Sequence, residues 1–198
     1  GKIGSERSMV LIRSRPRSNK TFRRRASGLL RDDSSVIPIL LYEGFQLKIF
    51  FLPSALLILA DQITKQLALT HLVAGPIKLL PFLSLHLTCN TGAAFSMLQG
   101  HTWLLSTVAV FFSGYFCYRI WRLPRGAFLE GWSYALILSG AVGNLVDRLT
   151  DGCVIDFVRF YYLNFSFPVF NLADTCITLG AAGWIVLMYR DSARKRTQ

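Results

Sequence analysis

The sequence has few of the residues that common catalytic and metal-binding motifs require. Its 198 residues include only 3 histidines and 4 cysteines. The histidines lack the H-E-x-x-H spacing of zinc peptidases, and no G-x-S-x-G motif of serine hydrolases is present. The cysteines form neither a C-x-x-C pair nor the spacing of zinc ligands. These absences argue against a zinc site, a dithiol redox motif and a serine hydrolase.

Two of the four cysteines have a simple interpretation. Cys117 and Cys176 fall within apolar stretches, where cysteine acts as a small apolar residue. Cys89 and Cys153 lie in connecting segments and could form a disulfide if both face an oxidising compartment. Nothing in the sequence requires that bond.

Acidic residues are also scarce. The chain has 11 Asp and Glu against 22 Lys and Arg, which gives a formal net charge of +11. In a soluble protein such a charge suggests nucleic-acid binding, but the cytoplasmic loops of membrane proteins accumulate the same excess. A mean hydropathy of +0.40 and 52% hydrophobic residues favour the second interpretation, a small polytopic membrane protein.

The basic residues are concentrated at the N-terminus. Residues 1–44 are rich in Arg and Ser and show no sustained apolar period, which predicts a basic, flexible cytoplasmic tail. No apolar core with a cleavage site follows closely, so the segment is not a secretory signal, although its arginines also resemble a transit peptide. Residues 45–198 then form the membrane domain.

Four apolar stretches follow the tail. Each is close to the ~20 residues that are needed to cross a ~30 Å hydrocarbon core. They are Leu47–Leu69, Thr102–Trp121, Phe128–Leu149 and Val169–Tyr189. The sequence therefore predicts an all-α membrane protein with four transmembrane helices.

The two longer connections carry different patterns. The first contains a period-two run, "LSLHLTCN" at residues 83–90, which predicts a small extramembrane β-structure. The second, residues 151–170, mixes aromatic and charged residues and is interpreted as an interfacial segment. Of the 22 Lys and Arg, 18 lie in the tail and its junction with the first stretch, in the short turn at residues 119–125, or at the C-terminus. By the positive-inside rule both termini are cytoplasmic, and both longer loops face outward.

Polar residues in three of the stretches fall at one predicted depth. At a rise of 1.5 Å per residue, Asp61 lies about 20 Å from Lys48 at the cytoplasmic end of its helix. Asn144 and Asp174 each lie about 24 Å from the cytoplasmic ends of their own helices. All three are therefore predicted in the outer leaflet, near the outer water interface. Ionisable residues inside a membrane usually mark a functional site.

The spacing of these polar residues groups them on shared helix faces. Asp61 and Lys65 are four apart with the acid first, the favourable order for a helical ion pair. Asn144 can face the same side as both Asp147 and Arg148, because they follow it by three and four residues.

The last two helices carry further signals. Asn171 in "FPVFNLADT" is predicted as the N-cap of the last helix, and Asp174 follows where a carboxylate meets free backbone N–H groups. Gly140 and Gly143 would let a neighbouring helix approach the third stretch closely.

Each acid also has a simpler structural interpretation. Asp174 could be only a capping carboxylate, and Asp156 only a partner for Arg159. Asp147 with Arg148 could be only an interfacial ion pair. Their coincidence at one depth favours a site over three unrelated structural roles.

Paired carboxylates have a specific chemistry. Two of them that share a proton can activate a water molecule and protonate a leaving amine, because their proximity separates their titrations. Three alternatives remain open: a nucleophilic Ser96 with Lys65 as its base, a small transporter or proton relay lined by carboxylates, and a membrane anchor whose basic tail binds anionic lipid or nucleic acid.

Five ordered motifs resemble the signature of the lipoprotein signal peptidases, also called signal peptidase II. They are "DQITK" from Asp61, "NTGAAFS" from Asn90, "GNLVDR" from Asn144, "VIDF" from Val154 and "FNLADT" from Phe170. Any one alone is weak, but five in order on the corresponding spans and loops are specific. The resemblance covers about residue 47 to the C-terminus and leaves the basic tail unaccounted for.

The resemblance implies an aspartic endopeptidase of the bacterial inner membrane. Members of this family remove signal peptides from diacylglyceryl-modified prolipoproteins by cutting before the lipidated cysteine, and they need no metal or organic cofactor. The resemblance makes Asp156 and Asp174 the catalytic pair. It implies prolipoprotein substrates and membrane lipids as partners. We expect no nucleic-acid partner and a monomeric protein.

The resemblance also suggests supporting roles around this pair. Asn144, Asn171 and Arg148 would fix the carboxylates and the substrate backbone, and Asp147 would orient Arg148. Asn90 and Gly92 belong to an outer loop that would close over the substrate. Asp61 and Lys65 would line the lower wall of the site.

Overall fold

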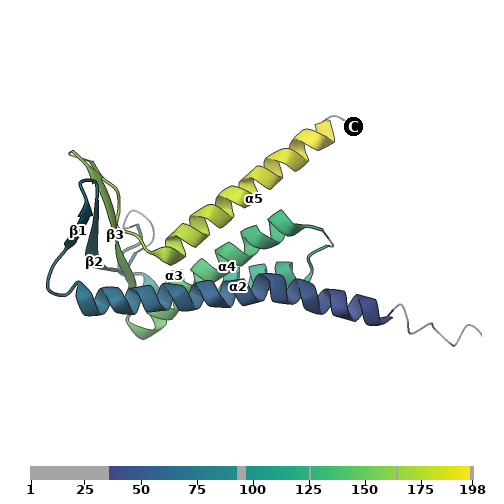
Figure 1. The fold of residues 1–198 in the computed structure, drawn as a ribbon, viewed down its shortest axis with the longest axis horizontal. Coiled ribbons are helices and arrows are strands. Elements are labelled where there is room, and N and C mark those ends of the chain that lie inside the picture. Colours follow the sequence, from purple (N-terminus) through teal and green to yellow (C-terminus); the bar gives the residue numbers. More distant parts are fainter. Residues whose placement is uncertain (1–35, 93–96, 125, 164, 197–198) are drawn as a thin grey trace, which may run out of the picture. The chain divides into compact units, whose positions relative to one another are not determined.

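The computed structural model describes residues 36–92, 97–124, 126–163 and 165–196, with side chains from Ile49 onward. The described residues form helices and a small antiparallel sheet (Figure 1). In chain order the elements are α2 (Val36–His71), β1 (Ile77–Leu80), β2 (Leu83–Asn90), α3 (Thr102–Trp121), α4 (Phe128–Thr150), β3 (Val154–Tyr162), β4 (Phe165–Ser166) and α5 (Leu172–Arg196). The strands of the sheet come from the connections between α2 and α3 and between α4 and α5.

The chain divides into two compact units, residues 1–42 and 43–198. Residues 1–35, most of the predicted tail, lie outside the described part of the chain. Residues 36–44 belong to α2, so the helix begins eleven residues before the predicted Leu47. The segment "VIPILLYEGF" is apolar enough to continue the helix, and its proline falls in the first turn, where no intrahelical N–H bond is lost.

The other predicted helices correspond closely to observed ones. The second stretch coincides with α3, and the third differs from α4 by one residue at its end. The fourth begins three residues later than predicted, because Asn171 caps α5, and it continues to Arg196. By length and composition, α3 and α5 are apolar enough to cross a membrane. The prediction that all four helices do so stays a prediction.

The sheet is larger than the sequence indicated. Strand β2 coincides with the predicted period-two run, but the segment interpreted as interfacial contains β3, which pairs antiparallel with β2. Valine, isoleucine and aromatic residues in "VIDFVRFYY" suit a strand, and pairing with β2 satisfies their backbone groups. The strand order is β1-β2-β3-β4.

Close packing between α4 and α5 depends on glycine. A Cβ atom at Gly140 would collide with the backbone carbonyl of Ala173, and one at Gly180 would lie 2.7 Å from the carbonyl oxygen of Ser133. Gly143 likewise faces Asp61 of α2, with 2.7 Å from a would-be Cβ to the carboxylate. The prediction that Gly140 and Gly143 permit close helix approach is confirmed.

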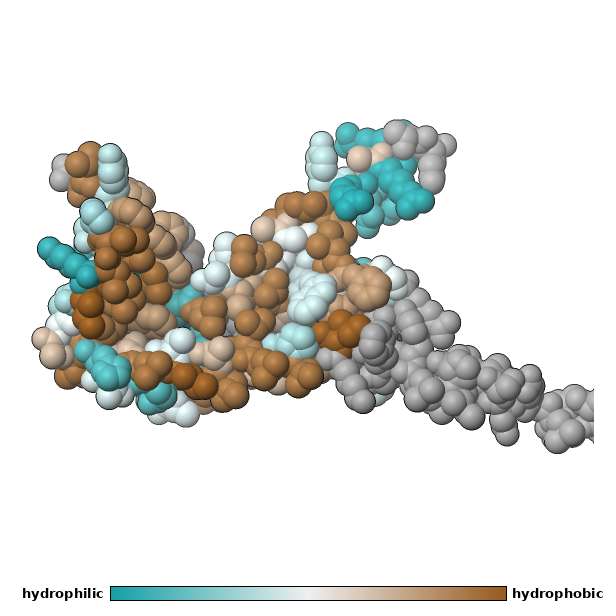
Figure 2. All heavy atoms as spheres, in the orientation of Figure 1, coloured by the Kyte–Doolittle hydropathy of each residue, from teal (hydrophilic) through white to brown (hydrophobic). Residues whose placement is uncertain are grey.

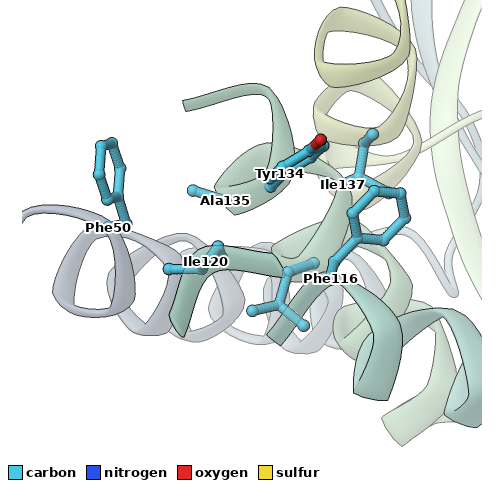
Figure 3. Packing of buried hydrophobic residues seen from close by; sticks show 7 residues of the cluster. Phe50, Phe116, Ile120, Tyr134, Ala135 and Ile137 are labelled. Atoms are coloured by element: carbon cyan, nitrogen blue, oxygen red, sulfur yellow. The ribbon is translucent and has the colours of Figure 1, made fainter. Parts of the chain in front are cut away.

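A compact apolar cluster lies at the ends of the helices opposite the sheet (Figure 3). Phe116 of α3 packs against Tyr134 of α4, with ring centroids 5.4 Å apart. The buried members are Phe50, Phe116, Ile120, Tyr134, Ala135, Ile137 and Leu138.

The surface and the interior have an unusual distribution of polarity. Large apolar side chains such as Leu56, Phe111 and Ile185 are more than half exposed, and brown apolar atoms cover much of the visible surface (Figure 2). Ionisable side chains are buried instead, among them Asp61, Lys65, Asp147 and Asp156. Apolar exterior and ionic interior are expected of a protein surrounded by lipid.

Candidate active site

Asp156 is a buried carboxylate near the start of β3. The residue is only 2% exposed to solvent. The Asn90 amide, at the end of β2, donates to Oδ2 at 3.0 Å, and the Asn171 amide donates to Oδ1 at 2.8 Å. Arg159 instead donates to Ser166, so the simpler interpretation of Asp156 as its ion-pair partner is wrong.

Backbone pairing brings the start of α5 to this carboxylate. Phe170 exchanges hydrogen bonds with Val158 of β3, at 2.8 and 3.0 Å. Antiparallel pairing at this position places the next residue, Asn171, beside the first half of β3. The fully buried Asn171 can therefore reach both Asp156 and the carbonyl oxygen of Ile155.

Asn171 and Asp174 form a reciprocal cap at the start of α5. The Asn171 side-chain oxygen accepts the backbone N–H of Asp174 at 2.8 Å, and the Asp174 carboxylate accepts the backbone N–H of Asn171 at 3.3 Å. This is the capping-box arrangement. The predicted N-cap is confirmed, and the same cap fixes Asp174 relative to the residue that holds Asp156.

A second amide connects the two carboxylates. Asn144 of α4 donates to Asp174 at 2.8 Å, and its side-chain oxygen accepts from Asn171 at 3.1 Å. The same oxygen accepts from Lys65 at 3.0 Å. Asp156 and Asp174 are thus linked by two asparagines, and Asp174 has a partner beyond its cap.

Lys65 lies between two carboxylates in the interior. Its ammonium is 2.7 Å from Asp61 and 2.7 Å from Asp147, and the residue is 1% exposed. The other oxygen of Asp61 accepts the backbone N–H of Ala173 at 2.9 Å, in the first turn of α5. The predicted ion pair of Asp61 and Lys65 is present, and the hydrogen bond from Ala173 to Asp61 joins α2 to the start of α5.

Asp147 and Arg148 each bond to residues outside the pair, and the expectation that Asp147 orients Arg148 stays a prediction. The Asp147 carboxylate binds Lys65 and accepts the backbone N–H of Ile155 at 3.1 Å. Arg148 instead donates to the carbonyl oxygens of Gly92 and Asn144, at 3.2 and 3.3 Å. The helical spacing related both residues to Asn144 but could not identify the partners of Asp147 on α2 and β3, or Gly92 as a partner of Arg148.

Gln62 was missed by the sequence reasoning. Its amide donates to Asp147 at 2.9 Å and to the carbonyl oxygen of Gly143 at 3.1 Å. Gln62 follows Asp61 directly, and the signal that could have found it is its place within the "DQITK" motif.

The residues assigned to the outer loop are only partly in it. Asn90 ends β2, and its side-chain oxygen accepts the backbone N–H of Gly92 at 2.9 Å in a tight turn. Asn90 therefore contacts Asp156 from the end of the sheet, and closure of the outer loop over the substrate stays a prediction. Ser96, the alternative nucleophile, lies outside the described residues.

The surroundings of Asp156 favour its protonated form. Burial, and then the negative charge of Asp174, raise the pKa of Asp156 to about 7. Hydrogen bonds from Asn90 and Asn171 and the charge of Lys65 act in the opposite direction. Near neutral pH such a carboxyl group can either give or take a proton, as general acid–base catalysis requires.

Comparisons with known proteins identify similar chains and one matching family. A family model described as signal peptidase (SPase) II matches residues 54–190. A lipoprotein signal peptidase from Acinetobacter baylyi is 46% identical over 132 residues, which are 64% of this chain and 74% of the relative. One from Shewanella loihica is 41% identical over 145 residues, 71% of this chain and 85% of the relative.

Solved structures show the same fold. One described as a bacterial membrane enzyme is 26% identical, has a TM-score of 0.68, and covers 74% of this chain and 91% of that chain. Another with the same description is 26% identical at a TM-score of 0.65, covering 72% of this chain and 94% of that chain.

Apolar helices that enclose a network of carboxylates and amides define the class, a membrane-embedded peptidase. Within that class, the chain belongs to the signal peptidase II family, as the five motifs indicated.

Proposed function

We propose that this protein removes signal peptides from prolipoproteins, with Asp156 and Asp174 as its catalytic carboxylates. One observation carries the assignment: both carboxylates are held by Asn171, one through its side-chain amide and the other through the cap of α5. Asn144 holds Asp174 from a third element. The arrangement fixes the relative positions of two acids from different elements. A reaction that uses both acids at once requires such fixed positions.

The two carboxylates divide the chemistry between them. One is ionised and takes a proton from the attacking water, while the other is protonated and polarises the scissile carbonyl. The protonated acid then supplies the proton that the leaving amine needs. A pKa of about 7 for Asp156 keeps one proton on the pair up to neutral pH, and this proton belongs to the pair as a unit.

Arg148 supports binding of the substrate backbone. Its side chain donates to the carbonyl oxygens of Gly92 and Asn144, but its Nε–H is buried without a hydrogen-bond partner among the described residues. A buried donor without a partner is unfavourable, because it has given up its hydrogen bond to water. A substrate carbonyl oxygen at this position would accept a hydrogen bond from it. Gly92 directly precedes residues 93–96, which are outside the described part of the chain.

The substrates are prolipoproteins that carry a diacylglyceryl group on the cysteine after the cleavage site. Acyl chains and an apolar signal helix confine such a substrate to the membrane plane, so a site at headgroup depth meets the scissile bond without extracting it. Exposed apolar side chains of the sheet, such as Phe160, Tyr162 and Phe165, suit contact with lipid at this depth.

The protein lies in the bacterial inner membrane with four spanning helices, cytoplasmic termini and the site on the outer side. Helices α2 and α4 have 36 and 23 residues, which exceed the ~20 that a span needs. The positive charge of the last turn of α5 supports a cytoplasmic C-terminus. In this proposal the enzyme is a monomer.

A transporter or proton relay is the weaker alternative. A relay needs titratable groups that continue from Asp174 toward the cytoplasmic ends of the helices. Glu130 lies there, but it is paired with Arg119 at 2.7 Å and accepts the hydroxyl of Tyr134. The family match favours peptidase chemistry instead.

The assignment is tested by cleavage of a diacylglyceryl-modified prolipoprotein with purified wild type, Asp156→Asn and Asp174→Asn. Each variant removes a group that must give or take a proton, so each should lose at least about 100-fold in kcat. Asp191→Asn, at an exposed position of α5, is the matched control and should keep the wild-type rate. Melting curves establish that all variants are folded. A folded Asp156→Asn or Asp174→Asn variant that cuts at nearly the wild-type rate would refute the catalytic pair.

A further inference from the structure

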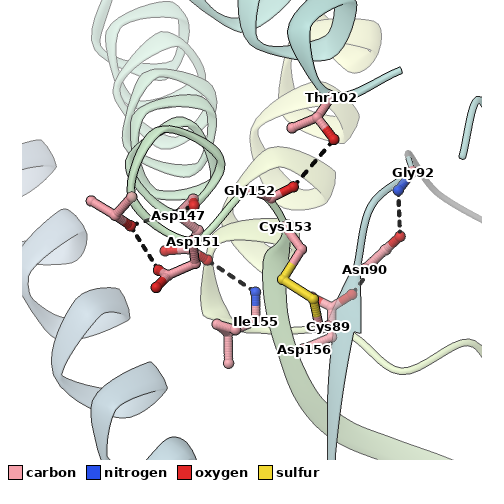
Figure 4. Close-up of a disulfide and its surroundings, with 11 residues drawn as sticks. Cys89, Asn90, Gly92, Thr102, Asp147, Asp151, Gly152, Cys153, Ile155 and Asp156 are labelled. Carbon is pink, nitrogen blue, oxygen red and sulfur yellow. Dashed lines mark hydrogen bonds between the residues drawn. A yellow bond between two sulfur atoms is a disulfide. The ribbon is translucent and has the colours of Figure 1, made fainter. Parts of the chain in front are cut away.

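A disulfide joins the two segments that form the sheet beside the site. Cys89 near the end of β2 is bonded to Cys153, directly before β3, with 5.5 Å between their Cα atoms (Figure 4). The two cysteines are 64 residues apart in sequence. Asn90 follows the first cysteine directly, and Asp156 lies three residues after the second.

The disulfide lies where the backbone ladder between β2 and β3 ends. The last aligned positions are Cys89 with Ile155 and Asn90 with Val154. The register shifts between Leu85 and Thr88, so the terminal part of the ladder is separated from the rest by an irregularity. The ends of strands open more readily than their centres. The covalent link therefore holds together the end of the ladder, which an irregularity separates from the rest.

This end of the ladder is also where Asn90 contacts Asp156. The donor is on β2 and the acceptor on β3, so their 3.0 Å hydrogen bond depends on the two strand ends staying together. The turn from Asn90 to Gly92 fixes the asparagine only relative to its own strand. Among the described contacts of Asp156, the bond from Asn171 reaches it from α5 and does not cross this ladder.

We propose that the Cys89–Cys153 disulfide is a positioning crosslink for the catalytic carboxylates: it holds Asn90 against Asp156, so that full peptidase activity requires oxidation of the two thiols. The inference rests on the proposed function, because it takes Asp156 as a catalytic group.

The oxidation balances by thiol–disulfide exchange. The two cysteine thiols give up two protons and two electrons and form one S–S bond, while the disulfide of an oxidant, such as a thiol–disulfide oxidoreductase or oxidised glutathione, becomes two thiols. Cys89 is exposed and Cys153 is buried. In oxidation the Cys89 thiolate therefore attacks the disulfide of the oxidant, and the Cys153 thiolate then displaces the oxidant from Cys89; in reduction an external thiolate attacks the sulfur of Cys89. The bond persists only in an oxidising compartment, in agreement with an outward-facing site.

Loss of this restraint has a signature in the pH profile. The amide of Asn90 stabilises the ionised form of Asp156, so its departure raises the pKa of Asp156 further. The other charged groups that act on Asp156 lie on three helices, Asp174 on α5, Lys65 on α2 and Arg148 on α4. Asp174 and Lys65 lie on helices that the disulfide does not join. Arg148 donates to Gly92 beside the crosslinked segment, so its displacement would raise the pKa of Asp156 in the same direction. In the reduced enzyme Asp156 should therefore stay protonated to higher pH, which moves the alkaline limb of the pH profile of kcat to higher pH.

The experiment compares kcat, KM and pH profiles of the full chain in detergent, with a diacylglyceryl-modified prolipoprotein as substrate. Wild type is measured oxidised, after reduction by dithiothreitol, and after reoxidation by oxidised glutathione, beside Cys89→Ser/Cys153→Ser. The reduced wild type and the double variant should lose about 10- to 100-fold in kcat and show the upward shift, since small misplacements of catalytic groups cost up to about 100-fold. Reoxidation should restore the wild type only. Cys117→Ser, an exposed free cysteine, is the matched control and should respond to both reagents like wild type.

An Asn90→Ala variant separates positioning from general stabilisation. It retains the disulfide but should reproduce the alkaline shift, and reduction should add little to it because both changes remove one contact. Unchanged kcat and pH profile on reduction would overturn the inference, and so would a loss of melting temperature and kcat without a pH shift. In either case an inactive Asp156→Asn leaves the proposed function intact, whereas an active Asp156→Asn contradicts that function first.

Discussion

At the scale of single residues, Lys65 shows how the interior tolerates charge. Its ammonium lies 2.7 Å from the carboxylates of Asp61 and Asp147, and the residue is only 1% exposed to solvent. Removing ions from water is costly, and the cost is recovered only when each charge has close partners and further hydrogen bonds. Asp61 and Asp147 have such bonds to the backbone of α5 and β3. The lysine therefore stabilises the part of the protein that holds the proposed catalytic pair.

Lys65→Met should destabilise the protein by about 3–5 kcal/mol, because it leaves two buried carboxylates without their counter-ion. Thermal or denaturant unfolding in detergent measures the effect. Lys78→Met, at an exposed position of β1, is the control and should change stability little. Adding Asp147→Asn to Lys65→Met should recover part of the loss, since one unpaired charge is removed. Equal stability of Lys65→Met and wild type would show that the ion pairs contribute nothing.

At the scale of elements, the site exists because α4, α5 and β3 meet closely. Gly140 lets α4 approach the backbone of Ala173 in the first turn of α5. The first turn of α5 carries Asp174. Asn171, the residue directly before α5, donates a hydrogen bond to Asp156 of β3. A small separation of α4 from α5 would therefore lengthen the bond from Asn144 to Asp174.

Gly140→Ala should reduce both stability and cleavage, because the added methyl group collides with a backbone carbonyl that cannot rotate away. We expect a loss of about 1–3 kcal/mol in unfolding free energy. Gly114→Ala in α3 is a matched control: nothing lies within 4 Å of its would-be Cβ atom. That change should be neutral or stabilising by up to about 1 kcal/mol, since alanine favours helix over glycine. Equal effects at the two positions would contradict close packing of α4 on α5.

At the scale of the whole molecule, chemistry and the basic N-terminal segment are separate in sequence. Every residue of the site falls between Asp61 and Asp174, and the family match begins at residue 54. Residues 1–44 carry much of the positive charge and precede both the family match and the first site residue, Asp61.

A chain of residues 45–198 should therefore cleave a diacylglyceryl-modified prolipoprotein with a kcat within about twofold of the full chain, because no catalytic group has been removed. Assays of both chains in the same detergent, with melting temperatures as the control for folding, test this. A folded short chain with unchanged kcat and a much higher KM would instead assign the N-terminal segment to substrate binding.

Much of the fold could be predicted because it depends on local patterns. The apolar length of Thr102–Trp121 defined α3, alternation defined β2, and Asn171 with Asp174 defined the cap of α5. The convergence of polar residues also followed from helix rise and charge asymmetry. Strand β3 could not be recognised in this way, because its aromatic and charged residues do not alternate and its pairing partner is 64 or more residues away.

The sequence by itself determined the class of the protein, the ordered motifs and the carboxylates that belong to them, because hydropathy, caps and motifs are local properties. Only the tertiary structure decided the partners: Asp147 with Lys65 and the N–H of Ile155, Gln62 with Asp147, and Cys89 with Cys153. A hydrogen bond or disulfide depends on distances of a few ångströms between segments far apart in the chain, and those distances are set by how helices and strands pack.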